Sequence, residues 1–161
     1  MGHHATCTDP KHHVHDGDAF VHEVERACEA RGLNLTPIRA TAMRLIADAG
    51  RPLKAYELLD RMKVTHGAAA PPTVYRALDF LVENGFVHKL ASINAFVGCH
   101  HPGAEAHAVP FLICDTCHSA TELEDASIVS SLDASARALG FTPQAQTLEV
   151  HGVCTDCAKR D

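Results

Sequence analysis

The chain of 161 residues lacks any long hydrophobic run. No segment approaches the roughly 20 consecutive apolar residues of a membrane-spanning helix. The N-terminus also has no apolar stretch of the kind that forms a signal peptide. We therefore expect a cytoplasmic protein with no membrane partner, in which cysteines stay reduced.

The side-chain sets of an enzyme are missing as well. No group of nucleophile, general base and oxyanion donors stands out. The two metal sites described below each use four protein ligands, which leaves no open position for a reacting group. We expect no catalytic residue, no enzymatic activity and no small-molecule substrate.

Basic residues are scarce in the second half of the chain. Residues 20–90 carry ten Lys and Arg against eight Asp and Glu, whereas residues 91–161 carry three against nine. The net charge of −6 therefore hides a mildly basic half that could bind a polyanion, next to an acidic half. The length fits one domain or two small ones, and this charge division favours two. Random surface variation is the alternative.

Four of the seven cysteines stand in two CxxC pairs, ICDTC and VCTDC. Each pair places two sulfurs on one tight turn, and two such turns form the tetrahedral four-sulfur cage that zinc favours. The predicted structural zinc ligands are Cys114, Cys117, Cys154 and Cys157. Two disulfides or two redox motifs are the alternatives. Cys7 and Cys28 have no partner at such spacing, and we expect them to be incidental or packing residues.

The first half has the apolar periodicity of four helices followed by a hairpin. Capping signals and breakers predict four helices. They run from Asp16 or Asp18 to Arg31, from Pro37 to about Ala49, near 55–63, and from Pro71-Pro72-Thr73 to Gly85. The segments 86–90 and 95–98 flank a polar turn at 92–94. Short helices followed by a hairpin describe a winged helix-turn-helix, in which one helix enters the major groove of double-stranded DNA.

The fourth helix is the predicted reading helix, because groove-reading helices make base contacts near their N-terminal end. Arg76 can donate to guanine or to phosphate. Tyr75 can pack on a thymine methyl group or hydrogen-bond a phosphate, and Thr73 can do either of these weakly. Arg39 and Lys54 are predicted phosphate contacts. The alternative for each is a solvated surface residue.

The motifs LTPIR at 35–39, PPTVYRAL at 71–78 and GFVHK at 85–89, with the two CxxC pairs, resemble the ferric uptake regulator family. The likeness covers about residues 20–158 and is nearest to the zinc uptake regulator branch. It implies an α+β fold with a winged-helix domain at 18–98, a hinge at 99–108 and a small α/β dimerisation domain at 109–161, after a flexible His-rich arm at 1–17. It also implies a homodimer and metal-dependent binding to a palindromic operator.

Two departures from the family pattern stand out. Ile38 stands where many members carry glutamine, which removes a polar contact to DNA but leaves Arg39 available. The approach to Cys114 is longer and differently composed than the compact histidine run of iron-sensing members. The second departure favours zinc over iron. An iron- or peroxide-responsive regulator remains the alternative, and a zinc-buffering module is the other class of protein left open.

The resemblance to the zinc branch also implies a regulatory zinc site. Its ligands would be His88, Cys99, His107 and Glu122. One thiolate, two imidazoles and one carboxylate suit four-coordinate zinc, and a thiolate disfavours magnesium or manganese. The sequence therefore predicts two zinc ions per chain, the second joining the two domains in the form that represses zinc-uptake genes. We expect His100, His101, His118 and His151 to be ordinary surface histidines, with an auxiliary metal site as the alternative.

In the second half, periodicity predicts strands at 109–113, 120–123 and 147–150 and a helix at 127–139. A sheet of three strands with one helix leaves an edge and a face uncovered. A two-fold partner would cover them.

Overall fold

The computed structural model describes residues 16–67, 70–102, 108–144 and 147–160 of the chain. These residues form two compact units, one ending at residue 102 and the other covering 108–160. Within the described residues, no helix is long and apolar enough to cross a membrane.

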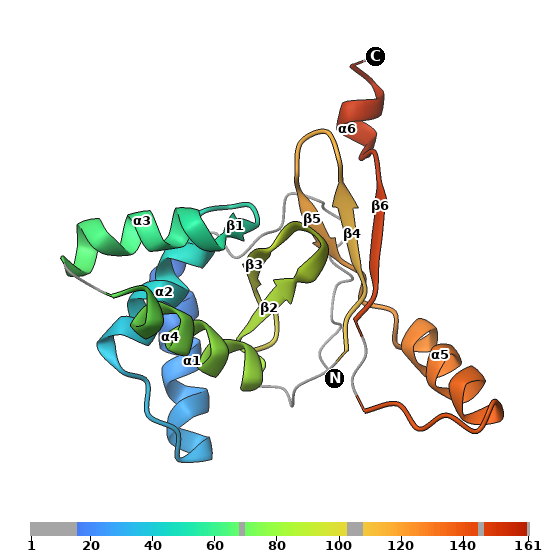
Figure 1. The fold of residues 1–161 in the computed structure, drawn as a ribbon, viewed down its shortest axis with the longest axis horizontal. Coiled ribbons are helices and arrows are strands. Elements are labelled where there is room, and N and C mark those ends of the chain that lie inside the picture. The colour runs from blue at the N-terminus through green and yellow to red at the C-terminus, as the bar shows by residue number, and fades with distance from the viewer. Residues whose placement is uncertain (1–15, 68–69, 103–107, 145–146, 161) are drawn as a thin grey trace, which may run out of the picture. The chain divides into compact units, whose positions relative to one another are not determined.

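Four helices make up most of the first unit (Figure 1): α1 (Gly17–Arg31), α2 (Pro37–Asp48), α3 (Ala55–His66) and α4 (Pro71–Glu83). The Asp16 carboxylate caps α1 by accepting hydrogen bonds from two backbone amides, and Gly32 ends the helix in the left-handed conformation. Proline at the start of α2 and α4 costs no hydrogen bond, because the first helical amides have no intrahelical partner. The four predicted helices are therefore present.

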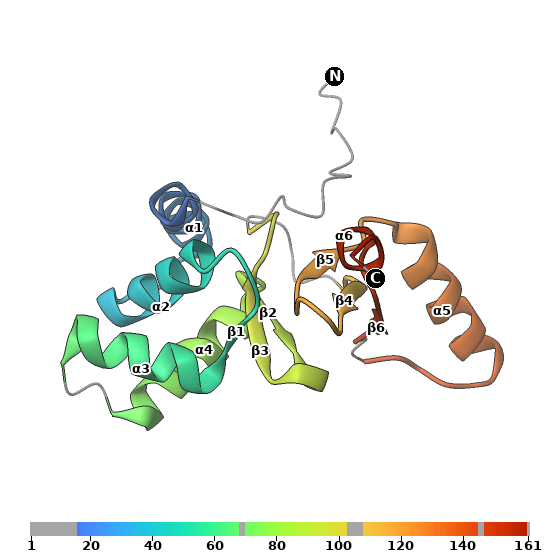
Figure 2. The ribbon, with the colours of Figure 1, turned by 90° about the horizontal axis from the view of Figure 1, so that it is seen from above.

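The wing is a hairpin that follows α4 along the chain and belongs to a small antiparallel sheet (Figure 2). It contains β2 (Val87–Leu90) and β3 (Ala95–Gly98), joined by the short helix η1 (Ala91–Ile93). A third strand, β1 (Leu53–Lys54), pairs with β3 and gives the order β1-β3-β2. The sequence predicted the hairpin but not β1, because a strand of two residues is too short to show a period.

A continuous hydrophobic core holds these elements together. The apolar faces of all four helices meet in it, with side chains such as Val24, Met43, Leu58 and Leu81 fully buried. Cys28 lies in this core, as expected of a packing residue. Phe86 and Phe96 tie the wing to the same core. The wing and α4 thus share one hydrophobic core.

The second unit has a three-stranded sheet of order β5-β4-β6, made of β4 (Phe111–Cys114), β5 (Ala120–Glu122) and β6 (Glu149–Gly152). Strand β5 pairs antiparallel with β4, and β6 pairs parallel with it. Helix α5 (Ala126–Ala138) connects β5 to β6, and the short helix α6 (Thr155–Ala158) follows β6 (Figure 1). The α+β fold with a helical N-terminal part is confirmed.

Several predicted boundaries differ from the structure. Helix α3 runs three residues past the predicted end at Lys63, because no breaker precedes Gly67. Strands β4 and β6 begin about two residues later than predicted, and α6 was not predicted. Thr36 occupies the N-cap of α2, but its side chain makes no capping hydrogen bond. Helix α1 begins at Gly17, inside the arm predicted over residues 1–17.

Candidate metal centre and nucleic-acid interface

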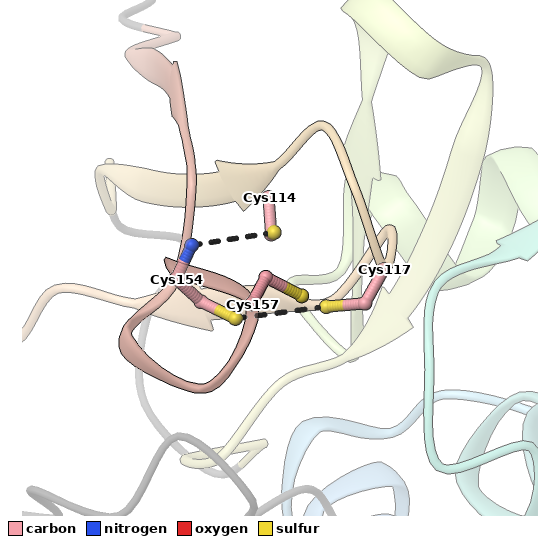
Figure 3. Close-up of side chains that lie close together, drawn as sticks. All are labelled: Cys114, Cys117, Cys154 and Cys157. Atoms are coloured by element: carbon pink, nitrogen blue, oxygen red, sulfur yellow. Dashed lines mark hydrogen bonds between the residues drawn. The ribbon is translucent and has the colours of Figure 1, made fainter. Parts of the chain in front are cut away.

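The four cysteines of the two CxxC pairs come together in the second unit. Cys114 ends β4 and Cys117 lies in the turn after it, while Cys154 and Cys157 lie at the start of α6 and within it (Figure 3). Their sulfur atoms all lie within 4.8 Å of one another. The two CxxC pairs are separated by 37 positions or more along the chain, yet they form one compact group of thiols, as the spacing predicted.

Backbone amides prepare this group for a cation. The amides of Cys117 and Cys154 donate to the Cys114 sulfur and lower the pKa of that thiol to about 6. The pKa of the Cys157 thiol is raised to about 12, mainly by its hydrogen bond with the Cys154 side chain. A bound cation would replace the protons of these thiols, because zinc binds cysteine as thiolate.

The geometry fits zinc. A tetrahedral site with zinc–sulfur bonds of about 2.3 Å separates its sulfur atoms by about 3.8 Å. The Cys117 and Cys154 sulfurs lie 3.8 Å apart, and all four cysteines are free thiols. A disulfide needs a separation of about 2.0 Å. The arrangement matches the metal cage better than the disulfide alternative.

Two of the predicted regulatory ligands lie on the wing of the first unit. His88 pairs with Val97 across the hairpin, and the Cys99 amide donates to the Phe86 carbonyl, which continues the ladder. Side chains alternate between the two faces of a strand, so His88 and Cys99 are diagonal neighbours on one face. The buried Cys99 sulfur accepts a hydrogen bond from the His101 amide. This face therefore presents an imidazole and a thiol together.

The other two predicted ligands belong elsewhere. Glu122 is half-buried at the end of β5 in the second unit. His107 lies outside the described residues, as does the predicted arm up to His15. The quartet thus remains a prediction.

Helix α4 turns its predicted DNA contacts outward. Thr73, Tyr75 and Arg76 are exposed in its first two turns, whereas Val74 and Ala77 between and after them are buried. Alternation of this kind leaves one face of the helix packed on the core and the other open to a groove. These exposed residues lie near the N-terminal end of α4, the end from which reading helices contact bases.

The two predicted phosphate contacts are held differently. The Arg39 guanidinium stacks 3.6 Å from the centre of the Phe80 ring and donates to the Asn34 carbonyl. It ties α2 to the reading helix, so a contact with DNA would come on top of this role. Lys54 is exposed at the N-cap of α3, where its backbone amide donates to Glu57. Its ammonium group has no such fixed role in the fold.

Tyr56 was not among the predicted residues. It lies in the first turn of α3 and is 62% exposed, although aromatic side chains are usually at least partly buried. In a helix-turn-helix, the helix before the reading helix crosses the DNA backbone. The sequence signal for Tyr56 was an aromatic residue at an outward-facing position near the start of a helix. Apolar periodicity does not detect it, because periodicity identifies only the buried face.

Comparison with known proteins gives this arrangement a family. The sequence model of the Ferric uptake regulator family matches residues 30–159. The zinc uptake regulation protein of Escherichia coli K12 is 37% identical over 137 residues, which cover 85% of this chain and 80% of that protein. Both cysteine pairs and the PPTVYRAL motif fall inside the family match.

Solved structures agree. The crystal structure of holo XcZur is 69% identical, with a TM-score of 0.83 over 88% of this chain and 99% of that chain. The crystal structure of apo XcZur, also 69% identical in sequence, has a TM-score of 0.53. A zinc uptake regulator complexed with zinc and DNA is 35% identical, with a TM-score of 0.85 over 89% of this chain and 96% of that one. The chain therefore belongs to the ferric uptake regulator family, in its zinc uptake regulator branch.

Proposed function

We propose that this protein is a zinc-responsive transcriptional repressor that binds the operators of zinc-uptake genes when zinc is abundant. The observation that carries the proposal is the match along 89% of the chain to a zinc uptake regulator solved with both zinc and DNA. The exposed N-terminal face of α4, with Tyr75 and Arg76, supports the DNA-binding part. The four-cysteine cluster supports the zinc-binding part.

Each chain binds two zinc ions in this proposal. The first fills the cage of Cys114, Cys117, Cys154 and Cys157 and stabilises the second unit. It has no open position and supplies no chemistry beyond holding the fold. The second ion is held by His88, Cys99, His107 and Glu122. The diagonal placement of His88 and Cys99 on one wing face supports this second set.

The regulatory ligands come from both units, so occupying them restricts how the units move relative to each other. Only some arrangements of two reading helices fit successive half-sites of a palindromic operator about one helical turn apart. Zinc binding would therefore increase operator affinity, and operator binding would increase zinc affinity by the same factor. The TM-scores with XcZur support such a change. The same chain aligns at 0.83 with holo XcZur and at 0.53 with apo XcZur, so the two states of that protein differ in structure.

A homodimer in the cytoplasm completes the proposal. Leu112 and Val150 are register partners on β4 and β6, and both are more than two-fifths exposed. With Val153 they line a hollow of about 630 Å³ in the second unit. An exposed apolar face of this kind is typical of a surface that a second protein covers. We expect a second copy of the chain there, because palindromic operators require two-fold symmetry.

The test measures metal content and operator affinity across buffered free zinc for the wild type, Cys99→Ser and Arg76→Ala. We expect two zinc ions per chain in the wild type and in Arg76→Ala, and one in Cys99→Ser. Operator affinity should rise with zinc in the wild type, be weaker at every zinc concentration in Arg76→Ala, and not respond to zinc in Cys99→Ser. The salt dependence of affinity should be shallower in Arg76→Ala if this side chain contacts phosphate.

Other outcomes point to other proteins. Operator binding that ignores zinc and responds to ferrous iron would indicate an iron-responsive regulator. Two zinc ions per chain with no specific DNA binding at any salt concentration would indicate a zinc-buffering module.

A further inference from the structure

The four-cysteine cluster has one exposed corner. Cys114 and Cys157 are buried and Cys154 is half-buried, whereas Cys117 is exposed. Water, acid and competing ligands reach an exposed ligand first. Whatever holds the Cys117 sulfur in place therefore has the strongest influence on how long the cage keeps its metal.

Ser119 is the residue that meets this sulfur. Its Oγ lies 3.1 Å from Cys117 Sγ, and its backbone amide also hydrogen-bonds to the Cys117 thiol. A zinc-bound cysteine is a thiolate and has no proton to donate. The hydroxyl must then be the donor, so one residue gives two hydrogen bonds to the exposed ligand.

The position of Ser119 is fixed by the turn that carries Cys117. The Ser119 carbonyl accepts a 2.9 Å hydrogen bond from the Cys114 amide, and the next residue, Ala120, begins β5 opposite Ile113. The side chain is half-buried and has only one torsion that moves its oxygen. The hydroxyl is therefore held near the sulfur before any metal binds.

The neighbouring ligand shows why this hydroxyl is informative. The Cys114 sulfur accepts from the Cys154 amide at 3.3 Å, a backbone donor that no substitution short of proline removes (Figure 3). At Cys117 one of the two donors belongs to a side chain. This contribution can be deleted by mutation while the backbone turn stays intact.

We propose that Ser119 is a positioning residue of the zinc site, whose hydroxyl holds the exposed Cys117 thiolate in the cage and slows the loss of zinc through that corner. The proposal rests on the proposed zinc occupancy of the cluster. Removing an outer-shell partner of a metal ligand typically changes metal affinity by 10- to 100-fold. A group at the exposed corner should also change the rate of release.

The test compares Ser119→Val with Ser119→Thr, both in the full-length Cys99→Ser background so that only the zinc of the cluster is followed. Valine and threonine have almost the same shape, and only threonine keeps the hydroxyl. Zinc release into excess EDTA gives the rate, and mass spectrometry after iodoacetamide treatment shows which cysteine reacts first. We expect release about tenfold faster in Ser119→Val, with Cys117 alkylated first, and release within about twofold of the background in Ser119→Thr.

Equal release from Ser119→Val and the background would overturn the proposal. Equally fast release from both variants would also overturn it, because the added methyl group rather than the lost hydroxyl would then be responsible. Ser119→Ala, which adds no bulk, provides the same comparison if the valine variant does not fold. Metal analysis before EDTA is added separates a failure of this proposal from absence of zinc in the cluster.

Discussion

The first unit buries its apolar side chains, whereas the second leaves many of them exposed. Among the residues that the structure describes, 22 of the 27 buried hydrophobic ones lie in the first unit, and two of the five in the second are cysteines of the cluster. Of the nine large hydrophobic residues exposed in the same described part of the chain, six belong to the second unit: Leu112, Leu132, Leu139, Phe141, Val150 and Val153. Helix α5 has no fully buried side chain. The two units must therefore be stabilised in different ways.

A small domain with so little core needs another source of stability. In the first unit the hydrophobic core is sufficient, because all four helices and the wing contribute to it. In the second unit, we expect the proposed zinc and a second copy of the chain to provide what the core does not. The predicted reading helix, α4, lies in the unit with the larger core.

Removing the cage should have the largest effect. We expect Cys114→Ser to unfold the second unit, since structural zinc contributes about 10–16 kcal/mol to the folding of small zinc domains. Hydrogen exchange should lose its protection in β4 to β6 and keep it in α1 to α4. Zinc content and the dimer should be lost together.

Cys28→Ala is the matched control, because Cys28 is a buried cysteine of the first unit that has no part in the cage. It should retain full zinc content and the protection of the second unit. Loss of protection across both units in Cys114→Ser would show that they fold as one, and would remove the distinction between them.

A core substitution should destabilise the first unit and leave the second unit unchanged, the opposite of Cys114→Ser. Leu58 is fully buried in the first unit, and Leu58→Ala should cost about 2–5 kcal/mol of that unit's stability. Denaturant unfolding followed by hydrogen exchange would locate the loss in α1 to α4, with zinc content unchanged. Leu139→Ala, at a side chain that is 88% exposed, is the control and should be nearly neutral in the monomer. Zinc loss from Leu58→Ala would contradict the separation.

An ion pair at the surface of the first unit should give a smaller, pH-dependent effect. The Arg51 guanidinium donates to both Glu57 oxygens, at 2.5 and 3.2 Å, and lowers the pKa of that carboxyl from 4.5 to about 2. Glu57 also accepts from the Lys54 amide at the start of α3. Arg51 is 45% exposed, so solvent screening limits the contribution to about 1–2 kcal/mol.

Because the pKa is lower in the folded state, this stability is present above pH 4.5 and lost as the pH falls toward 2. We expect Glu57→Gln to destabilise the first unit at pH 7 and to match the wild type near pH 2. Urea unfolding monitored on the first unit at a series of pH values measures the difference. A gap that stayed constant down to pH 2 would mean that the charge is not responsible.

Sequence patterns predicted the first unit better than the second for the same physical reason. A helix that packs on a core shows its apolar period, so α1, α2 and α4 and their ends at Gly32 and Gly85 could be predicted. The spacing of the cysteines predicted the cluster, because the sulfur geometry is local to each turn. Strands β4 and β6 begin about two residues later than predicted, whereas β5 begins where expected. Strands of three or four residues show too little of a period to fix their ends.

Side-chain contacts between distant residues lay beyond the sequence. Nothing in LTPIR indicates that Arg39 stacks on Phe80, because the contact depends on how α2 crosses α4. Nor does the spacing of the CxxC pairs show which cysteine is exposed. Such facts require the packed structure.

The smallest predicted effect concerns a strained turn in the second unit. His118 has φ of 59°, in the left-handed region where a Cβ atom is unfavourable, and its amide donates to the Cys114 carbonyl within the turn that carries Cys117. Glycine adopts this conformation without the steric cost, so His118→Gly should stabilise the zinc-loaded second unit by about 0.5–1 kcal/mol. His118→Ala keeps the Cβ atom and should give no gain. Thermal melts of the two variants measure the difference, and an equal gain in both would show that loss of the imidazole, not relief of backbone strain, is the cause. A gain in glycine alone would mean that the turn carrying Cys117 holds backbone strain at His118, which the contacts of the folded second unit must offset.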